Sequence, residues 1–209
     1  MATAGTLGMQ INPFDADPER QRAVFLNVPY DNAYQAYFAT LVCTLVCLGL
    51  VPRCVLEVRE VGQGRLNRIF DLLRNCGASI HDLSRVGSPP RFNMPFELGI
   101  ACALAMRGDR HEVVVIDRRP HRLDRLLSDY KGRDPEIYAG CTGLIDAVVD
   151  AFESDPRIDL DRLRQDVGGL RRAANALADL GGGTLFKRAT FRALIEMATE
   201  KAEKLGYIR

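Results

Sequence analysis

Two carboxylates mark the part of this sequence with the greatest capacity for chemistry. Asp82 ends a short predicted strand, and Glu97 lies beyond a loop that is rich in serine, proline, glycine and arginine. A carboxylate can act as an acid, a base or a nucleophile when burial and neighbouring charges adjust its pKa. We therefore predict a candidate site in which Asp82 and Glu97 flank one loop.

Glu97 has two interpretations. An acid in the first turn of a helix commonly stabilises that helix against its macrodipole, by roughly 0.3–1 kcal/mol. However, neighbours such as Phe96, Leu98 and Ile100 make the predicted helix apolar nearly all round. We therefore expect the carboxylate to be partly buried where the sheet opens to ligand, which favours a functional role.

Hydrophobic patterning predicts the elements that position these residues. Short apolar runs predict strands over 23–28, 51–58, 77–82 and 111–117, with an edge strand over 136–139. Helical length and periodicity predict helices over 33–48, 65–75, 123–128, 142–152, 160–180 and 186–205. A further helix has Pro95 in its first turn, and its predicted buried stripe is Phe96, Gly99, Ile100, Ala103 and Leu104.

The alternation of strands with helices predicts right-handed crossovers and a parallel sheet. We expect an α/β fold of flavodoxin-like (Rossmann-like) type: a mainly parallel five-stranded sheet with helices on both faces, plus C-terminal helices. Such sheets bind ligands at the C-terminal edge of their strands. The predicted organisation is a polar lead-in over 1–20, the α/β domain over 21–155 and a C-terminal helical extension over 156–209. The extension could pack on the domain, form a dimer surface or bind a partner.

Charge and hydropathy exclude several classes of function. The 209 residues carry 28 Lys and Arg against 27 Asp and Glu, a net charge of +1. This balance does not attract nucleic acid or an anionic membrane, so direct nucleic-acid binding is not expected and any anionic ligand must be recognised locally. The longest apolar run, 38–51, is too short to span a bilayer, and the N-terminus lacks a secretory pattern. We expect one soluble, cytoplasmic domain.

Cysteine and histidine usage does not indicate a metal site. The six cysteines lie in apolar runs without a CxxC pair, and the three histidines are scattered. We interpret the cysteines as buried thiols of a reducing compartment and assign no metal.

The residues around the loop carry a family resemblance. Asp82-Leu-Ser84, followed by Asn93-Met-Pro-Phe-Glu-Leu-Gly-Ile-Ala101, resembles the nucleoside 2-deoxyribosyltransferase-like and TIR-like superfamily. There, a third strand with a similar end precedes a loop and a helix of the form Asn-x-x-Phe-Glu-Leu-Gly-x-Ala. Val24-Phe-Leu-Asn-Val-Pro-Tyr-Asp31 is similar to the first strand and loop of TIR domains, which hold a nucleotide. The resemblance covers residues 23–153.

The resemblance implies roles for both carboxylates. Glu97 would act at the anomeric carbon during N-glycosidic cleavage, as a nucleophile or by stabilising an oxocarbenium-like centre. Asp82 would bind ribose hydroxyls or assist proton transfer to the leaving base, and a strand-end turn is the alternative role. The expected substrate is NAD or another nucleotide, with no separate cofactor.

The predicted substrate-binding residues lie on the loops beside these carboxylates. Arginines can hold phosphate and aromatic rings can stack on a base, but each also has an ordinary role in packing or on the surface. Asn93 either caps its helix or orients Glu97. The full set is Asn27, Tyr30, Asp31, Ser84, Arg85, Arg91, Phe92 and Asn93.

Three functions compete at this point. The first is an N-glycosidase that acts on NAD or a related nucleotide. Such an enzyme could serve as an effector or signal producer in antiphage defence. We expect it to be a homo-oligomer, and its C-terminal helices could bind a protein partner. The second is a non-catalytic nucleotide sensor or adaptor of the same fold, favoured by the proline-rich loop before Glu97. The third, a phosphotransfer receiver or flavodoxin, ranks last because the first strand is followed by neither an acidic cluster nor a phosphate loop.

Overall fold

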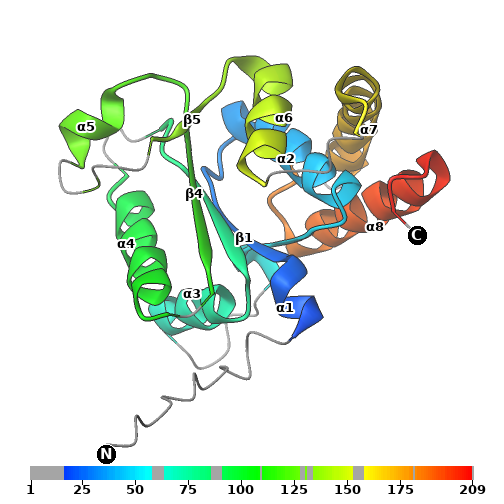
Figure 1. Ribbon diagram of the computed structural model, residues 1–209. Helices are drawn as coiled ribbons and strands as arrows, with labels where there is room; N and C mark the ends of the chain where they lie inside the picture. Colours follow the sequence, from blue (N-terminus) through cyan, green and yellow to red (C-terminus); the bar gives the residue numbers. More distant parts are fainter. Residues whose placement is uncertain are drawn as a thin grey trace, which may run out of the picture.

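The sheet at the centre of the protein has five parallel strands. A computed structural model describes residues 17–57, 64–85, 91–108, 110–127, 130, 134–152, 158–180 and 182–208 (Figure 1). The strand order is β2-β1-β3-β4-β5, and every neighbouring pair is parallel. This order confirms the predicted flavodoxin-like α/β fold. The strands are β1 (Ala23–Asn27), β2 (Val51–Arg53), β3 (Ala78–Asp82), β4 (Glu112–Asp117) and β5 (Glu136–Ile137).

Helices cover both faces of this sheet (Figure 1). Helices α3 (Arg65–Arg74) and α4 (Asn93–Met106) lie on one face, and α2 (Gln35–Cys47) and α6 (Gly140–Ala151) lie on the other. The C-terminal helices form a further layer outside α2. The remaining elements are α1 (Pro18–Arg22), α5 (Arg122–Leu126), α7 (Leu160–Leu180), α8 (Arg188–Leu205) and two 3₁₀ turns, η2 (Asn32–Tyr34) and η3 (Val55–Glu57).

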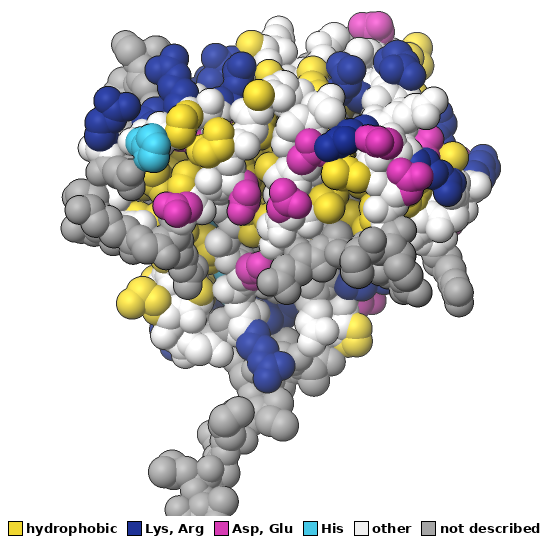
Figure 2. Space-filling view, turned by 45° about the horizontal axis from the view of Figure 1, so that its top comes forward, with side chains coloured by type: hydrophobic (Ala, Val, Ile, Leu, Met, Phe, Trp, Pro, Cys, Tyr) yellow, Lys and Arg dark blue, Asp and Glu magenta, His cyan; other side chains and the backbone are white. Residues whose placement is uncertain are grey.

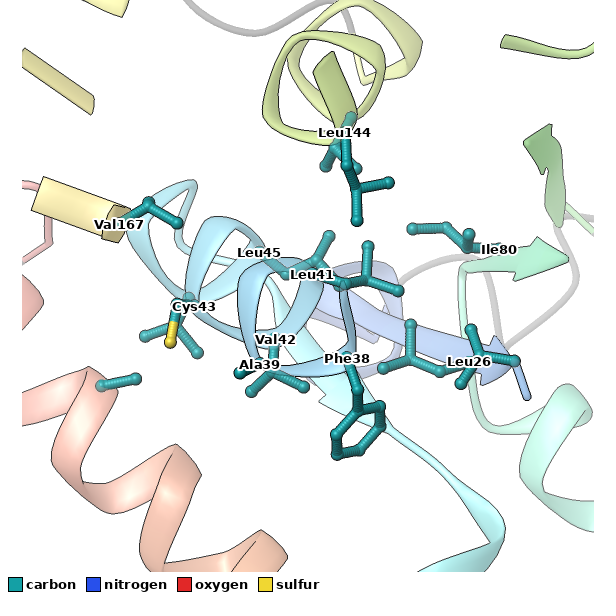
Figure 3. Close-up of a cluster of buried hydrophobic side chains, with 14 of the residues drawn as sticks. Leu26, Phe38, Ala39, Leu41, Val42, Cys43, Leu45, Ile80, Leu144 and Val167 are labelled. Atoms are coloured by element: carbon teal, nitrogen blue, oxygen red, sulfur yellow. The ribbon is translucent and has the colours of Figure 1, made fainter. Parts of the chain in front are cut away.

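Helix α2 is the centre of the larger core. All ten residues from Phe38 to Cys47 are buried, because β2, α6, α7 and α8 contact the helix. Figure 3 shows Leu41 near Ile80 of β3 and Leu144 of α6 on one side of α2. Val167 of α7 closes another side. The C-terminal helices therefore pack on the domain, the first of the three roles considered for them.

The fold differs from the predicted elements at two places that matter for the site. Strand β2 ends at Arg53 rather than 58, and position 58 lies outside the described residues. The chain turns at Cys54 because the Glu57 carboxylate accepts hydrogen bonds from the Cys54 amide and the Arg53 guanidinium, both at 2.8 Å. The lead-in predicted over 1–20 is helical from Pro18, where Asp17 accepts a hydrogen bond from the Glu19 amide.

The buried stripe predicted for α4 is correct at Leu104 and partly correct at Ile100, which is half-buried, but it is wrong at the other three positions. Phe96, Gly99 and Ala103 are exposed, whereas Met94, Glu97, Leu98, Ala101 and Leu104 are buried. Apolar residues on every side of this helix leave no periodicity from which its orientation could be read. The buried side is therefore decided by packing against β1, β3 and β4.

The strand order reverses between β1 and β3. In sheets of this order, ligands bind in the crevice outside the carboxyl ends of these two strands. Asn27 ends β1 and is paired in register with His81, the residue before the end of β3. Among the described residues, no helix combines the length and hydropathy that crossing a membrane requires.

Candidate functional site

Glu97 is a buried carboxylate near the start of α4. It is the fifth residue of the helix, and only 5% of it is exposed. Burial raises the pKa of Glu97 from 4.5 to about 7, although the positive charge of Arg65 and a hydrogen bond with Asn93 act in the opposite direction. Because the first turn of α4 contains no acid, stabilisation of the helix macrodipole does not explain this residue. Near neutral pH the side chain can both hold and release a proton.

Asn93 orients Glu97 rather than capping the helix. Phe92 occupies the cap position, and no side chain accepts a cap hydrogen bond there. The Asn93 side chain instead hydrogen-bonds Glu97. Phe92 is 73% exposed, so its ring is available at the surface beside the start of α4. Of the two roles considered for Asn93, the structure favours orientation.

Tyr30 contributes a hydroxyl to the surroundings of Glu97. Its ring is half-buried and packs edge-on against Phe38 and Phe186, with centroids 6.2 and 5.6 Å apart. Its hydroxyl donates to the Leu26 carbonyl at 3.3 Å. Burial raises the pKa of Tyr30 well above 10, Cys54 raises it further, and the charge of Glu97 has a smaller effect in the same direction. These contacts occupy part of the ring that the predicted base-stacking role of Tyr30 would use.

Asp82 lies on the opposite side of the sheet from Glu97. Successive residues of a strand point to opposite faces. Ile80 packs in the core with α2 and α6, and Asp82 points the same way, whereas His81 points toward α4 through its bond with Asn27. The two predicted catalytic carboxylates share one edge of the sheet, but the structure does not bring them together.

The oxygens of Asp82 are occupied by internal hydrogen bonds. The residue is fully buried, and Oδ2 accepts from the hydroxyls of Tyr34 at 2.5 Å and Tyr138 at 2.7 Å. Oδ1 accepts from the Ser84 amide at 2.7 Å, which is the strand-end turn considered as an alternative role. Burial raises the pKa of Asp82, against the effect of these hydrogen bonds. Asp82 thus fastens the ends of β3 and β5 to the start of α2.

Asp31 gathers the two predicted phosphate-binding arginines. Its carboxylate accepts from Arg85 at 2.8 Å and from Arg91 at 3.0 Å, and it also accepts from the Tyr34 amide at 3.1 Å. The two guanidiniums come from the two ends of the loop after β3, whose residues 86–90 lie outside the described residues. All three charged side chains are partly exposed. An anionic ligand could therefore reach the arginines by displacing Asp31.

Asn27 is turned inward rather than toward ligand. Its Nδ2 donates to the Met94 carbonyl and meets His81 Nδ1, both at 2.9 Å, and the residue is 3% exposed. The predicted direct contact of Asn27 with substrate therefore does not fit the use of its amide hydrogens. The residue instead ties the end of β1 to the start of α4.

The sequence analysis missed several residues that build this edge. Arg65 begins α3 beside Glu97, and a helix start after a glycine-containing loop was the signal available for it. Arg122 makes a bidentate ion pair with Asp117, in which the closest contact joins Nη2 and Oδ1 at 2.8 Å. Its guanidinium also donates hydrogen bonds to the carbonyls of Leu83 and Ser84. This pairing holds the ends of β3 and β4 together, and the short sequence distance between Asp117 and Arg122 was its only sign.

Both signs of charge occupy the surface around this edge. In Figure 2, Lys and Arg side chains gather along the upper margin, while Asp and Glu side chains cross the middle with hydrophobic groups between them. Anion recognition on the face in view must therefore depend on local arginines. Within the described part of the chain, no cluster of three or more His, Cys, Asp or Glu side chains is placed to hold a metal ion.

The fold and site define a flavodoxin-like α/β protein with a buried, protonatable carboxylate beside the strand-order reversal. No protein-family model matches the chain, and no curated protein matches it significantly in sequence. The superfamily resemblance therefore rests on the residues quoted for it.

Proposed function

We propose that the protein is an N-glycosidase that acts on NAD or a related nucleotide through Glu97. The observation that carries the proposal is the buried Glu97 carboxylate, whose pKa is raised to about 7. It lies at the sheet edge where folds of this order bind ligands. In its ionised form the group suits the positive charge that develops at the ribose C1 atom when the bond to the base breaks.

The chemistry at C1 needs few other groups when the leaving base is a pyridinium. The electron pair of the breaking C–N bond neutralises the positive ring nitrogen, so nicotinamide leaves without taking a proton. A new bond then forms at C1 with water in hydrolysis, with a group of the same nucleotide in cyclisation or with another base in base exchange, and an attacking water gives up its proton to solvent. This matters because Asp82 faces the other side of the sheet, and the Tyr30 hydroxyl, whose pKa is raised well above 10, is a weak acid. The surroundings of Glu97 therefore support NAD as substrate ahead of nucleosides whose base must be protonated to leave.

The test incubates purified protein at high concentration with NAD and measures the released nicotinamide by chromatography. A panel of nucleosides and nucleotides is tested in parallel for release of their bases. Glu97→Gln keeps the size and polarity of the side chain but removes its charge, and we expect it to abolish release. Glu136→Gln, at the edge strand β5, is the matched control and should retain activity. Equal release by wild type and Glu97→Gln would refute the proposal.

A non-catalytic nucleotide sensor of the same fold is the alternative. This alternative is supported because two of the predicted site groups, the Asn27 amide and the Asp82 carboxylate, already form hydrogen bonds with other residues of the protein. Binding of nucleotide by wild type and Glu97→Gln, without release of base by either, would favour this function. A role in antiphage defence belongs to the enzymatic proposal and rests on the resemblance alone.

Self-association is a further part of the proposal, and the outer surface of α3 and α4 supports it. Glu97 is the only charged residue of α4, and it is buried. Phe96 is 58% exposed and forms part of the wall of a hollow of about 380 Å³, which Leu66, Phe70 and Ile100 also help to line. A projecting ring next to an apolar hollow is self-complementary, so a two-fold axis can seat each ring in the partner's hollow. A protein partner on α7 and α8 has less support, because their apolar faces are used within the core.

A further inference from the structure

A continuous chain of buried hydrogen bonds runs beneath α4 along β3. It begins at a backbone carbonyl near the amino end of the sheet and finishes at a carbonyl in the first turn of α4. Its links all measure 2.8–2.9 Å, and the side chains are at most 7% exposed. In order, its groups are the Cys76 carbonyl, His111, Ser79, His81, Asn27 and the Met94 carbonyl.

The direction of this chain follows from its ends. The Cys76 carbonyl can only accept, so His111 carries its proton on Nδ1 and, when neutral, accepts from the Ser79 hydroxyl at Nε2. The Ser79 oxygen must then accept from Nε2–H of His81. Nδ1 of His81 is left as an acceptor for the amide of Asn27. One arrangement of protons satisfies every link.

The Met94 end of the hydrogen-bond chain independently requires the same arrangement of protons. The Met94 carbonyl can only accept, so the Asn27 nitrogen, not its oxygen, must face it. The other hydrogen of that nitrogen then points to His81. Burial and the neighbouring His111 lower the pKa of His81 to about 3, so His81 is neutral and can accept at Nδ1. A reversal anywhere in the chain leaves a buried polar group without its partner, which is costly.

This chain determines where the first turn of α4 lies. Met94 is the second residue of α4 and is itself buried in a cluster with Leu83, just after β3, and Val115 of β4. Glu97 follows three residues later, so both lie on adjacent positions of one helical turn. The bond from Asn27 to the Met94 carbonyl therefore ties the turn that carries Glu97 to the end of β1, at the strand-order reversal.

We propose that Asn27 and His81 are positioning residues for Glu97, acting through the first turn of α4. The kinetic consequences rest on the proposed function, but the positioning itself does not. Asn27 holds the helix, and His81 holds Asn27 in the one orientation that can donate to Met94. Arg65 and Asn93 are the groups that lower the pKa of the Glu97 carboxyl against the effect of burial.

The first test is the tautomer of each histidine, measured by ¹⁵N NMR of the imidazole rings in the full chain at neutral pH. We expect the Nε2–H form for His81 and the Nδ1–H form for His111. A protonated His81, or the Nδ1–H form of His81, would overturn the proposal, because Asn27 could no longer donate to both of its partners. This test needs no variant.

The second test is the titration of Glu97, followed by ¹³C NMR of its carboxyl carbon without substrate. Asn27→Leu removes the donor at similar size, and Ser79→Ala breaks the chain two links away. We expect either change to loosen the helix start, admit water and lower the pKa of Glu97 by about one pH unit, a tenfold change in proton affinity. Thr40→Val is the control, because it removes a buried hydroxyl bonded to Ala36 within α2.

The control separates positioning from a general loss of stability. Thr40→Val should leave the titration of Glu97 unchanged. An unchanged titration in folded Asn27→Leu and Ser79→Ala would overturn the proposal. Because these titrations use no substrate, a protein that cleaves nothing can still confirm positioning, and the failure of the glycosidase proposal remains distinguishable from the failure of this one.

Discussion

Asp82 and Glu97, separated by one loop in the sequence, lie toward opposite faces of the sheet. Asp82 is held by Tyr34 and Tyr138 on the side of α2 and α6, whereas Glu97 belongs to α4. The two carboxylates therefore have different surroundings and different expected roles. Glu97 is the candidate for chemistry, and Asp82 is the candidate for holding the sheet edge together.

The stability of the protein should reveal the cost of burying Glu97. Its pKa rises from 4.5 to about 7 on folding, so ionisation in the folded state costs about 3 kcal/mol more than in the unfolded chain. The contribution of protonated Glu97 to the free energy of unfolding is complete below pH 4.5 and is lost as the pH rises through about 7. We expect Glu97→Gln to raise the free energy of unfolding at pH 8 by up to about 3 kcal/mol, and by little at pH 4. Urea unfolding at both pH values measures this, and equal effects at both would contradict it.

The rate of glycosidic cleavage should follow the ionisation of Glu97. Because the reaction needs the carboxylate, kcat/KM should rise with pH and level off above about 7, the pKa of Glu97. Nicotinamide release measured from pH 5 to pH 9 gives the profile. A rate that falls over this range would assign Glu97 the role of proton donor instead.

Replacement of Asp82 should damage the fold rather than the chemistry. Asp82→Asn exchanges one acceptor oxygen for an amide donor, which cannot satisfy the hydroxyls of Tyr34 and Tyr138 together with the Ser84 amide. We expect a loss of about 1–3 kcal/mol in the free energy of unfolding, with the activity of the folded fraction retained. Chemical denaturation and activity per folded molecule measure the two effects. A loss of about 100-fold in folded protein, the size of a general acid–base contribution, would restore a catalytic role for Asp82.

Removal of the Asp31 charge should free the two arginines at the loop after β3. Asp31→Asn weakens its pairs with Arg85 and Arg91, and since all three are partly exposed the stability should change by less than about 1 kcal/mol. We expect tighter binding of ADP-ribose, which carries phosphates, and unchanged binding of adenosine. Calorimetric titration measures both affinities, with Arg85→Gln as the variant expected to weaken ADP-ribose binding. Weaker ADP-ribose binding by Asp31→Asn would contradict the prediction.

Self-association should depend on the projecting ring of α4. Phe96→Ser removes the side chain next to the hollow between α3 and α4, so we expect light scattering to report a smaller mass than for wild type. Leu180→Ser is the control, because Leu180 is 88% exposed at the end of α7, away from this surface. Equal masses for wild type and Phe96→Ser would exclude this surface as the site of assembly.

The sequence by itself determined the class of fold and the burial of Glu97. Apolar runs of strand length, alternating with helices, predict the parallel sheet, because both faces of such a sheet are covered and its strands must be hydrophobic. The burial of Glu97 could be predicted as well, because its neighbours on α4 are apolar on every side.

Only the tertiary structure decided which groups meet at the sheet edge. In a strand buried on both faces, apolar residues do not alternate with polar ones. The sequence pattern of β3 therefore does not predict the face of the sheet to which Asp82 points. The same holds for α4, whose buried side carries Glu97 although every side is apolar. The contact of Asn27 with His81 joins strands that are far apart in the sequence, and the enclosure of α2 depends on helices at the end of the chain. Such relationships arise when strands pair and layers pack, and local sequence does not specify them.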